Sequence, residues 1–129
     1  FCLSRGLGDV YKRQGLTFIA GTVRNDGRSA SLQFLVDSGA EYTLLPHDTW
    51  QELGLNAVDR HTFVLADGTP VERDLAECRF EMDQGATNTW VILGEPGDEA
   101  LLGVYTLEGL RLVLNPFNRT LRPARLRLT

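Results

Sequence analysis

The sequence predicts a single all-β domain, a small closed barrel with one or two short helices. The chain has 129 residues, of which 43% are hydrophobic and 23% are charged, as expected for one globular domain of ordinary size. Its apolar residues fall mainly in short β-type runs that are separated by turn residues. Only two stretches have a spacing that suits a helix, and both are short. Many short strands with few helices are typical of a small barrel.

The first fourteen residues, FCLSRGLGDVYKRQ, do not continue this pattern, because their charged residues follow no period of 2 or 3.6. The stretch GDVYKRQ is similar to the translated end of a transposon of the kind used to fragment DNA for sequencing. We therefore interpret residues 1–14 as a sequencing or cloning artefact or a disordered tail, and we assign the domain to residues 15–129. A genuine edge strand at the N-terminus is the alternative.

The first predicted elements of the domain form a β-hairpin. Strands at residues 16–23 and 31–36 flank the sequence NDGR, in which Asp26 and Gly27 tolerate the positive φ of a tight turn. The second strand runs directly into DSGA, and YTLLP begins another extended segment.

Two short helices are predicted. Residues 46–53 begin with Pro46, which is acceptable in a first helical turn, and are followed by Gly54, which suits a helix end. The second helix is expected around residues 104–108.

The remaining segments are predicted as strands. Residues 61–82 form a long hairpin with its turn at Asp67 and Gly68, and a further strand follows at 89–94. RLVLNP and TLRPARLRL close the chain as extended segments.

The segment FLVDSGA places one carboxylate, Asp37, at the end of an apolar strand and before Ser38 and Gly39. A hydroxyl residue and a glycine after the acid suit a tight turn in which backbone N–H groups hold the carboxylate in one orientation. The motif alone is weak, since Asp-Ser/Thr-Gly should occur by chance in about one chain in twenty of this length. An ordinary turn, in which the aspartate bonds its own backbone, is the alternative.

Two later stretches give the motif its weight. VLADGTPV at residues 64–71 is a hairpin tip with a glycine, and ALLGVYTL at residues 100–107 is an apolar pair followed by glycine and a helix start. In this order and spacing the chain resembles the retropepsin-like (retroviral-type, clan AA) aspartic peptidases. Their fold is a small all-β barrel of the acid protease type, and RLVLNPFNRTL is similar to the family's closing strand.

The resemblance implies a role for each residue that matches a family motif. The catalytic residue would be Asp37. The residues that support the active-site turn would be Ser38, Gly39 and Ala40. The flap would be formed by Ala66, Asp67 and Gly68, and the segment under the turn by Leu101, Leu102 and Gly103. The sequence departs from the viral members at Val104 and Tyr105, where those place an Arg and an Asp or Asn that help to tie their dimer together.

The resemblance also implies the reaction, hydrolysis of peptide bonds by a water held between two aspartates. That chemistry needs no metal, cofactor or covalent intermediate. No other aspartate that we weighed as a second partner in this chain is followed by Ser/Thr-Gly. These are Asp48, Asp59, Asp67, Asp74, Asp83 and Asp98. A homodimer would supply Asp37 twice across one two-fold axis.

Composition and spacing limit the other functions. The net charge of −4 argues against nucleic acid as a partner, and no apolar run approaches the roughly 18 residues of a membrane-spanning helix. His47 and His61 lack neighbours at metal-ligand spacing, so no metal site is expected, and Cys78 suits a buried strand.

The expected partners are a second copy of the chain and a peptide or protein substrate, with a cytoplasmic location as the starting expectation. The alternatives are a non-catalytic dimerisation or peptide-binding module with the same fold, and a domain that cuts itself out of a longer precursor.

Overall fold

The computed structural model describes residues 2–4, 10–13, 16–37, 39–115 and 120–128. The described strands are β1 (Cys2–Ser4), β2 (Val10–Arg13), β3 (Leu16–Asn25), β4 (Arg28–Val36), β5 (Thr43–Leu45), β6 (Asp59–Val64), β7 (Pro70–Met82), β8 (Gly85–Leu93), β9 (Leu101–Leu102), β10 (Leu112–Asn115) and β11 (Thr120–Pro123). The described helices are α1 (His47–Glu52) and α2 (Val104–Gly109). The predicted all-β class with short helices is confirmed.

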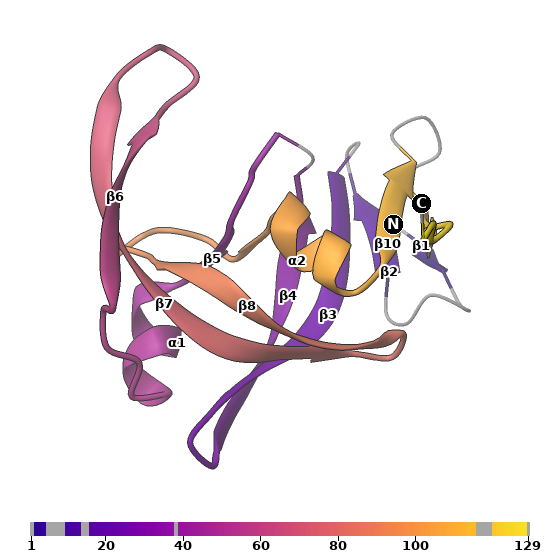
Figure 1. Ribbon diagram of the computed structural model, residues 1–129, viewed down its shortest axis with the longest axis horizontal. Coiled ribbons are helices and arrows are strands. Elements are labelled where there is room, and N and C mark those ends of the chain that lie inside the picture. The colour runs from indigo at the N-terminus through magenta and orange to yellow at the C-terminus, as the bar shows by residue number, and fades with distance from the viewer. Residues whose placement is uncertain (1, 5–9, 14–15, 38, 116–119, 129) are drawn as a thin grey trace.

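The main sheet closes on itself. Its strands run in the order β1-β2-β3-β4-β9-β5-β8-β7-β6, and an additional pairing joins β3 to β7. The ring of hydrogen-bonded neighbours therefore consists of β3, β4, β9, β5, β8 and β7, and it is visible as the curled sheet in Figure 1. The ring leaves β6 outside it, paired with the first half of β7. The resulting hairpin projects from the body, because β7 bonds β8 only from Leu75 onward.

The turn residues of the first hairpin act as predicted. Asp26 and Gly27 have φ values of 50° and 81°, and they join β3 to β4 in a continuous antiparallel register. Positive φ is tolerated at aspartate and costs glycine little, so these two residues permit the tight connection. The strands are longer than predicted, since pairing continues to the Asn25–Arg28 position next to the turn.

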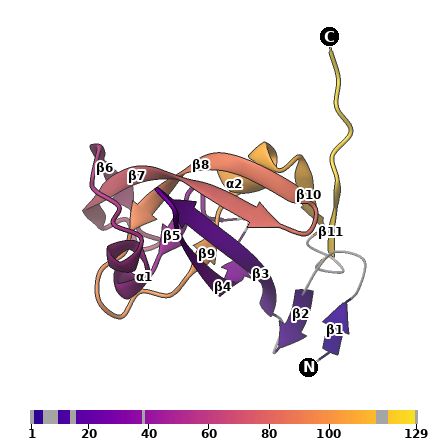
Figure 2. The same cartoon turned by 90° about the horizontal axis from the view of Figure 1, so that it is seen from below.

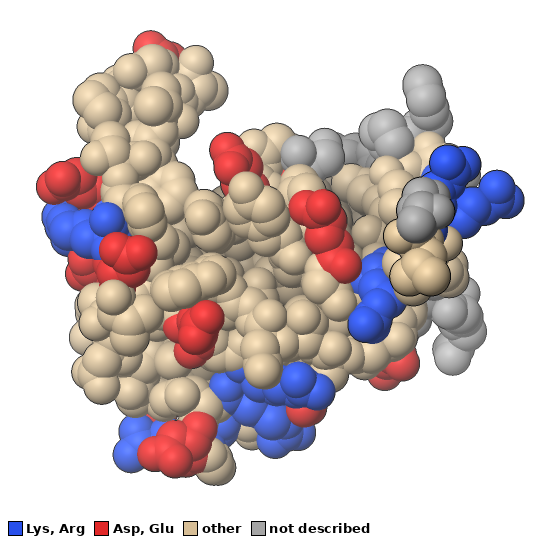
Figure 3. All heavy atoms as spheres, viewed as in Figure 1, with Lys and Arg blue, Asp and Glu red and all other residues tan. Residues whose placement is uncertain are grey.

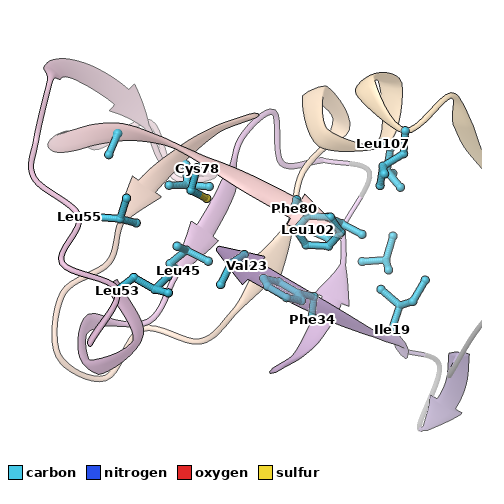
Figure 4. Close-up of a cluster of buried hydrophobic side chains, with 14 of the residues drawn as sticks. Ile19, Val23, Phe34, Leu45, Leu53, Leu55, Cys78, Phe80, Leu102 and Leu107 are labelled. Atoms are coloured by element: carbon cyan, nitrogen blue, oxygen red, sulfur yellow. The ribbon is translucent and has the colours of Figure 1, made fainter. Parts of the chain in front are cut away.

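Among the described residues, one apolar cluster fills the ring and continues to α2, β10 and β11 (Figure 4). Phe34 and Phe80 meet edge to face with ring centroids 5.2 Å apart. Gly21 leaves room for them, because a β-carbon there would lie 2.6 Å from the Phe80 ring. Fully buried aromatic rings in this arrangement contribute more than their buried area alone. The other large side chains that are fully buried include Ile19, Leu45, Leu53, Leu75, Leu102 and Leu121.

The two ends of the chain lie outside the ring. β2 pairs with β3, and β1 pairs with β2, so both extend the sheet at its β3 edge. The division into residues 1–14 and 15–129 stays a prediction. At the other end, β10 and β11 form a separate two-stranded sheet. The predicted final extended segment is a strand only as far as Pro123, and Figure 2 shows the following residues leading away from the body.

Candidate active site

The Asp37 turn, which we define as residues 37–42, begins directly after β4. The N–H of Asp37 donates to the carbonyl oxygen of Leu102 over 3.4 Å, and the N–H of Ala40 donates back to the Asp37 carbonyl oxygen over 3.1 Å. The N–H of Gly39 donates to Oδ1 of the Asp37 carboxylate over 2.8 Å. The carboxylate is exposed, and this Gly39 N–H is its one hydrogen-bond partner among the described residues. The turn thus holds the Asp37 carboxylate by one hydrogen bond while leaving it exposed to solvent.

The predicted support residues contribute unequally. Gly39 donates the hydrogen bond to the carboxylate, and a β-carbon at that position would lie 3.2 Å from Asp37 Oδ1. Ala40 is half-buried, and its carbonyl oxygen accepts the N–H of Val104 over 2.9 Å. Ser38 lies outside the described residues, so its bracing role stays a prediction.

The predicted underlying segment does lie against the turn. β9 sits between β4 and β5, with Leu101 and Leu102 in parallel register with the last two residues of β4. Gly103 comes directly after β9, and its backbone lies very close to the turn. A β-carbon at Gly103 would lie 2.3 Å from the carbonyl carbon of Tyr42. The N–H of Tyr105 donates to the carbonyl oxygen of Glu41 over 3.0 Å. Backbone hydrogen bonds from both sides of Gly103 therefore hold the turn in place.

The sequence reasoning missed a set of buried threonine hydroxyls below the turn. Thr43 and Thr106 are fully buried, and Thr89 is 8% exposed. Their Oγ1 atoms lie one after another within hydrogen-bonding distance. Thr43 Oγ1 is 2.6 Å from Thr106 Oγ1, and Thr106 Oγ1 is 2.9 Å from Thr89 Oγ1. The available signal was a threonine inside otherwise apolar runs, in YTLLP and in VYTL, but nothing local connects positions so far apart in the chain.

The predicted flap is the tip of the β6–β7 hairpin. The carboxylate of Asp67 accepts the N–H of Thr69 over 2.9 Å, and Gly68 has a φ of +88° that favours glycine. Hydrogen bonds from the hydroxyl and N–H of Thr69 hold the pKa of the Asp67 carboxyl below its ordinary value. Ala66, Asp67 and Gly68 are all exposed. The tip is therefore an exposed turn held by its own hydrogen bonds.

A groove of about 600 Å³ separates the flap hairpin from the body. Figure 3 shows this hollow, where most of the visible atoms belong to residues without charge. The ring of Phe63 on the hairpin meets Tyr42 on the body edge to face, with centroids 5.5 Å apart. The Asp37 turn contributes Gly39, Ala40, Glu41 and Tyr42 to the walls. Other walls are formed by Leu44, Val64, Leu65, Val71, Ile92 and Leu101. Four apolar side chains of the hairpin, at positions 63, 64, 65 and 71, line the groove, and two of them, Val64 and Leu65, are also largely exposed.

The described histidines and Cys78 form no metal site and no reactive nucleophile. Among the described ranges, no three His, Cys, Asp or Glu side chains are grouped so as to hold a metal ion. His47 packs edge to face on Trp50, and His61 lies 3.0 Å from the carboxylate of Asp59. Burial raises the pKa of the Cys78 thiol to about 12, which makes it inert as a nucleophile near neutral pH. No helix in the described part of the chain is both long and apolar enough to cross a membrane.

Comparison with known proteins places the chain in a family. The family model described as aspartyl protease matches residues 19–104, which contain the Asp37 turn, the flap and β9. No curated protein sequence matches. Among solved structures, the protease of simian foamy virus (mac) is 18% identical, with a TM-score of 0.49 over 69% of this chain and 91% of the viral chain. Because the family model covers most of its length, the chain belongs to the aspartyl protease family.

Proposed function

We propose that the protein is an aspartic endopeptidase that works as a homodimer, with Asp37 of each subunit forming the catalytic pair. The observation that carries this proposal is the exposed Asp37 carboxylate, held by the Gly39 N–H in a turn whose next residues line the groove. An ordinary surface turn would not need the close fit of Gly103 beneath it.

The proposed reaction is general acid–base catalysis. Two carboxylates within hydrogen-bonding reach share one proton, because two like charges at that distance cannot both ionise comfortably. The ionised aspartate removes a proton from water, which attacks the scissile carbonyl carbon. The protonated aspartate donates to the carbonyl oxygen. The Gly39 N–H keeps each Asp37 carboxylate turned toward the shared water.

The second carboxylate is assigned to another copy of the chain. Asp67 lies on the flap, where its carboxylate bonds Thr69. Asp98 lines the groove, but one of its oxygens accepts the N–H of Glu95 over 2.8 Å within its own loop. Neither residue stands in a turn like that of Asp37. A two-fold axis next to the Asp37 turn would place two identical carboxylates face to face.

The substrate proposed for the groove is an extended peptide. An extended segment between flap and floor can form backbone hydrogen bonds with both, while pockets receive its side chains. The apolar walls formed by Leu44, Phe63, Val71, Ile92 and Leu101 favour apolar side chains near the scissile bond. The non-catalytic alternative, a peptide-binding or dimerisation module, would use the same groove without turnover.

The test is hydrolysis of a mixed peptide library between about pH 4 and 7, because the protonation of a coupled carboxylate pair, and with it the rate, should depend on pH. We expect Asp37→Asn to lower the rate by about 10³-fold or more, because it removes both the acid and the base. Asp26→Asn is the matched control, since it makes the same chemical change at the opposite end of β4, where asparagine also tolerates positive φ. If the wild type and Asp37→Asn are equally inert while both dimerise, the protein is a binding module.

A further inference from the structure

The buried threonines beneath the Asp37 turn form a continuous line of hydrogen bonds. The N–H of Gly103 donates to Oγ1 of Thr43 over 3.0 Å. Thr43 Oγ1 lies 2.6 Å from Thr106 Oγ1, which in turn lies 2.9 Å from Thr89 Oγ1. The Thr89 hydroxyl donates to the carbonyl oxygen of Trp90 over 3.3 Å. The line therefore joins the start of α2 to β5 and β8 through the interior of the protein.

Counting protons gives this line a direction. Each hydroxyl has one hydrogen to donate. Because the Thr89 hydrogen goes to the Trp90 carbonyl oxygen, the contact with Thr106 must use the Thr106 hydrogen. The Thr106 oxygen then accepts the hydrogen of Thr43, whose own oxygen accepts the N–H of Gly103. Every hydroxyl donates once and accepts once, so no polar atom of the line is left without a partner, as burial requires.

This line ends at the segment that holds the Asp37 turn. The carbonyl oxygen of Leu102 accepts the N–H of Asp37, and the N–H of Val104 donates to Ala40. Gly103 lies between these two contacts, and its N–H is bound by Thr43. The position of Gly103 therefore sets the position of both neighbouring contacts with the turn.

We propose that Thr43 is a positioning residue for Asp37, acting through Gly103, and this inference rests on the proposed peptidase function. Catalysis needs two carboxylates within about 2.6–3.2 Å of one water, and a displacement of about 1 Å can cost on the order of 100-fold in rate. In a homodimer both copies of the turn carry the same displacement. Loss of the Thr43 hydroxyl would leave the Gly103 N–H buried without an acceptor and release the segment from its fixed position.

The test compares two substitutions at one position. Thr43→Val keeps the shape and removes the hydroxyl, whereas Thr43→Ser keeps the hydroxyl and removes a methyl group. Thr17→Val is the matched control, because Thr17 is 3% exposed and its hydroxyl has no hydrogen-bond partner among the described residues. Ile19→Val is a second control, which lowers the melting temperature by removing one buried methyl group and leaves the hydrogen bonds intact.

We expect Thr43→Val to lower kcat at least about tenfold, with a smaller change in KM, and Thr43→Ser to recover most of that loss. The two limbs of the pH profile should also move toward one another in Thr43→Val, because carboxylates that lie farther apart are less strongly coupled. Thr17→Val and Ile19→Val should keep the wild-type kcat and profile. If Thr43→Val lowers only the melting temperature, as Ile19→Val does, Thr43 has no positioning role.

A second readout separates this inference from the proposed function. Amide resonances of Gly39 and Ala40 should shift in Thr43→Val and stay in place in Thr43→Ser and Thr17→Val, whether or not the protein cuts peptides. Unchanged resonances in Thr43→Val would overturn the inference. A wild type no more active than Asp37→Asn would overturn the peptidase proposal and leave the resonances to decide the role of Thr43.

Discussion

At Gly103 the backbone passes so close to the Asp37 turn that a side chain has no room. A β-carbon at this position would lie 2.3 Å from the carbonyl carbon of Tyr42 and 2.5 Å from its oxygen. These are backbone atoms, which cannot rotate away as the end of a flexible side chain can. The close approach lets the hydrogen bonds on both sides of Gly103 reach the turn, while Gly103 is also the N-cap residue of α2.

We expect Gly103→Ala to lower the free energy of unfolding by about 3 kcal/mol or more, because the backbone must shift to admit the methyl group. Gly97→Ala is the control, since Gly97 has a φ of +93° and nothing within 4 Å of an added β-carbon. It should cost only about 1 kcal/mol for its backbone conformation. Urea-induced unfolding measures both. Equal losses for the two variants would contradict the steric explanation.

At the residue scale, the sequence identified the residues with a local signature and missed the others. Asp37 and Gly39 stand in a recognisable turn motif, and Gly103 follows an apolar pair. Thr43 and Thr106 are 63 positions apart and meet only because β5 and α2 pack together in the folded chain. A hydroxyl that is satisfied by a distant element looks, in sequence, like any polar residue in a strand or helix.

The flap hairpin shows how local chemistry shapes an element. β6 and β7 pair in continuous register up to Val64 and Pro70, and the turn between them is closed by the N–H of Leu65 bonding the carbonyl oxygen of Thr69 over 2.8 Å. Val64 is 71% exposed and Leu65 49% exposed, so the tip presents apolar side chains to the groove and to solvent. Such a tip would lose this exposed apolar surface on closing over a peptide.

The order of this tip should depend on pH through Asp67. The Thr69 hydroxyl and N–H hold the Asp67 pKa below its ordinary value of 3.8, so the hydrogen-bonded turn is favoured above that value and lost as pH falls through the lowered pKa. We expect the Thr69 amide resonance to be constant from about pH 5 to 7 and to titrate with a midpoint below 3.8. Measurement in the Asp37→Asn background avoids self-cleavage. Asp67→Ala should abolish the titration, and a midpoint at or above 3.8 would contradict the account.

At the element scale, hairpins were more predictable than the ring. Alternation and turn residues predicted the β3–β4 hairpin and the long 61–82 hairpin, and helix start and end signals predicted the first short helix, because each depends on neighbouring residues. Closure of the ring depends on the β3–β7 contact and on the parallel pairing of β5 with β8. Those contacts join distant segments, and local periodicity carries no information about which strands will meet. The many short strands and the family resemblance both predicted a barrel, but the local pattern did not say which strands would close it.

At the scale of the whole molecule, the described part of the chain offers a groove, a hairpin proposed as a flap, and the Asp37 carboxylate held in its turn. The proposed chemistry requires two such carboxylates at one water, so activity should belong to the dimer and not to the subunit. Tyr105 is 49% exposed next to the Asp37 turn and packs edge to face on Tyr42, with ring centroids 5.1 Å apart. Val104 and Tyr105 stand where the viral members of the resembled family place polar residues that help to tie their dimer together, so the proposed dimer would need different contacts.

The most direct test of the central claim mixes wild-type subunits with Asp37→Asn subunits and measures peptide hydrolysis per wild-type subunit. If each active site needs Asp37 from both subunits, an equal mixture should show about half the activity per wild-type subunit, and excess mutant should reduce it toward zero. Mixing with Asp26→Asn should leave the activity unchanged. Activity per wild-type subunit that stays constant as Asp37→Asn is added would contradict the shared active site.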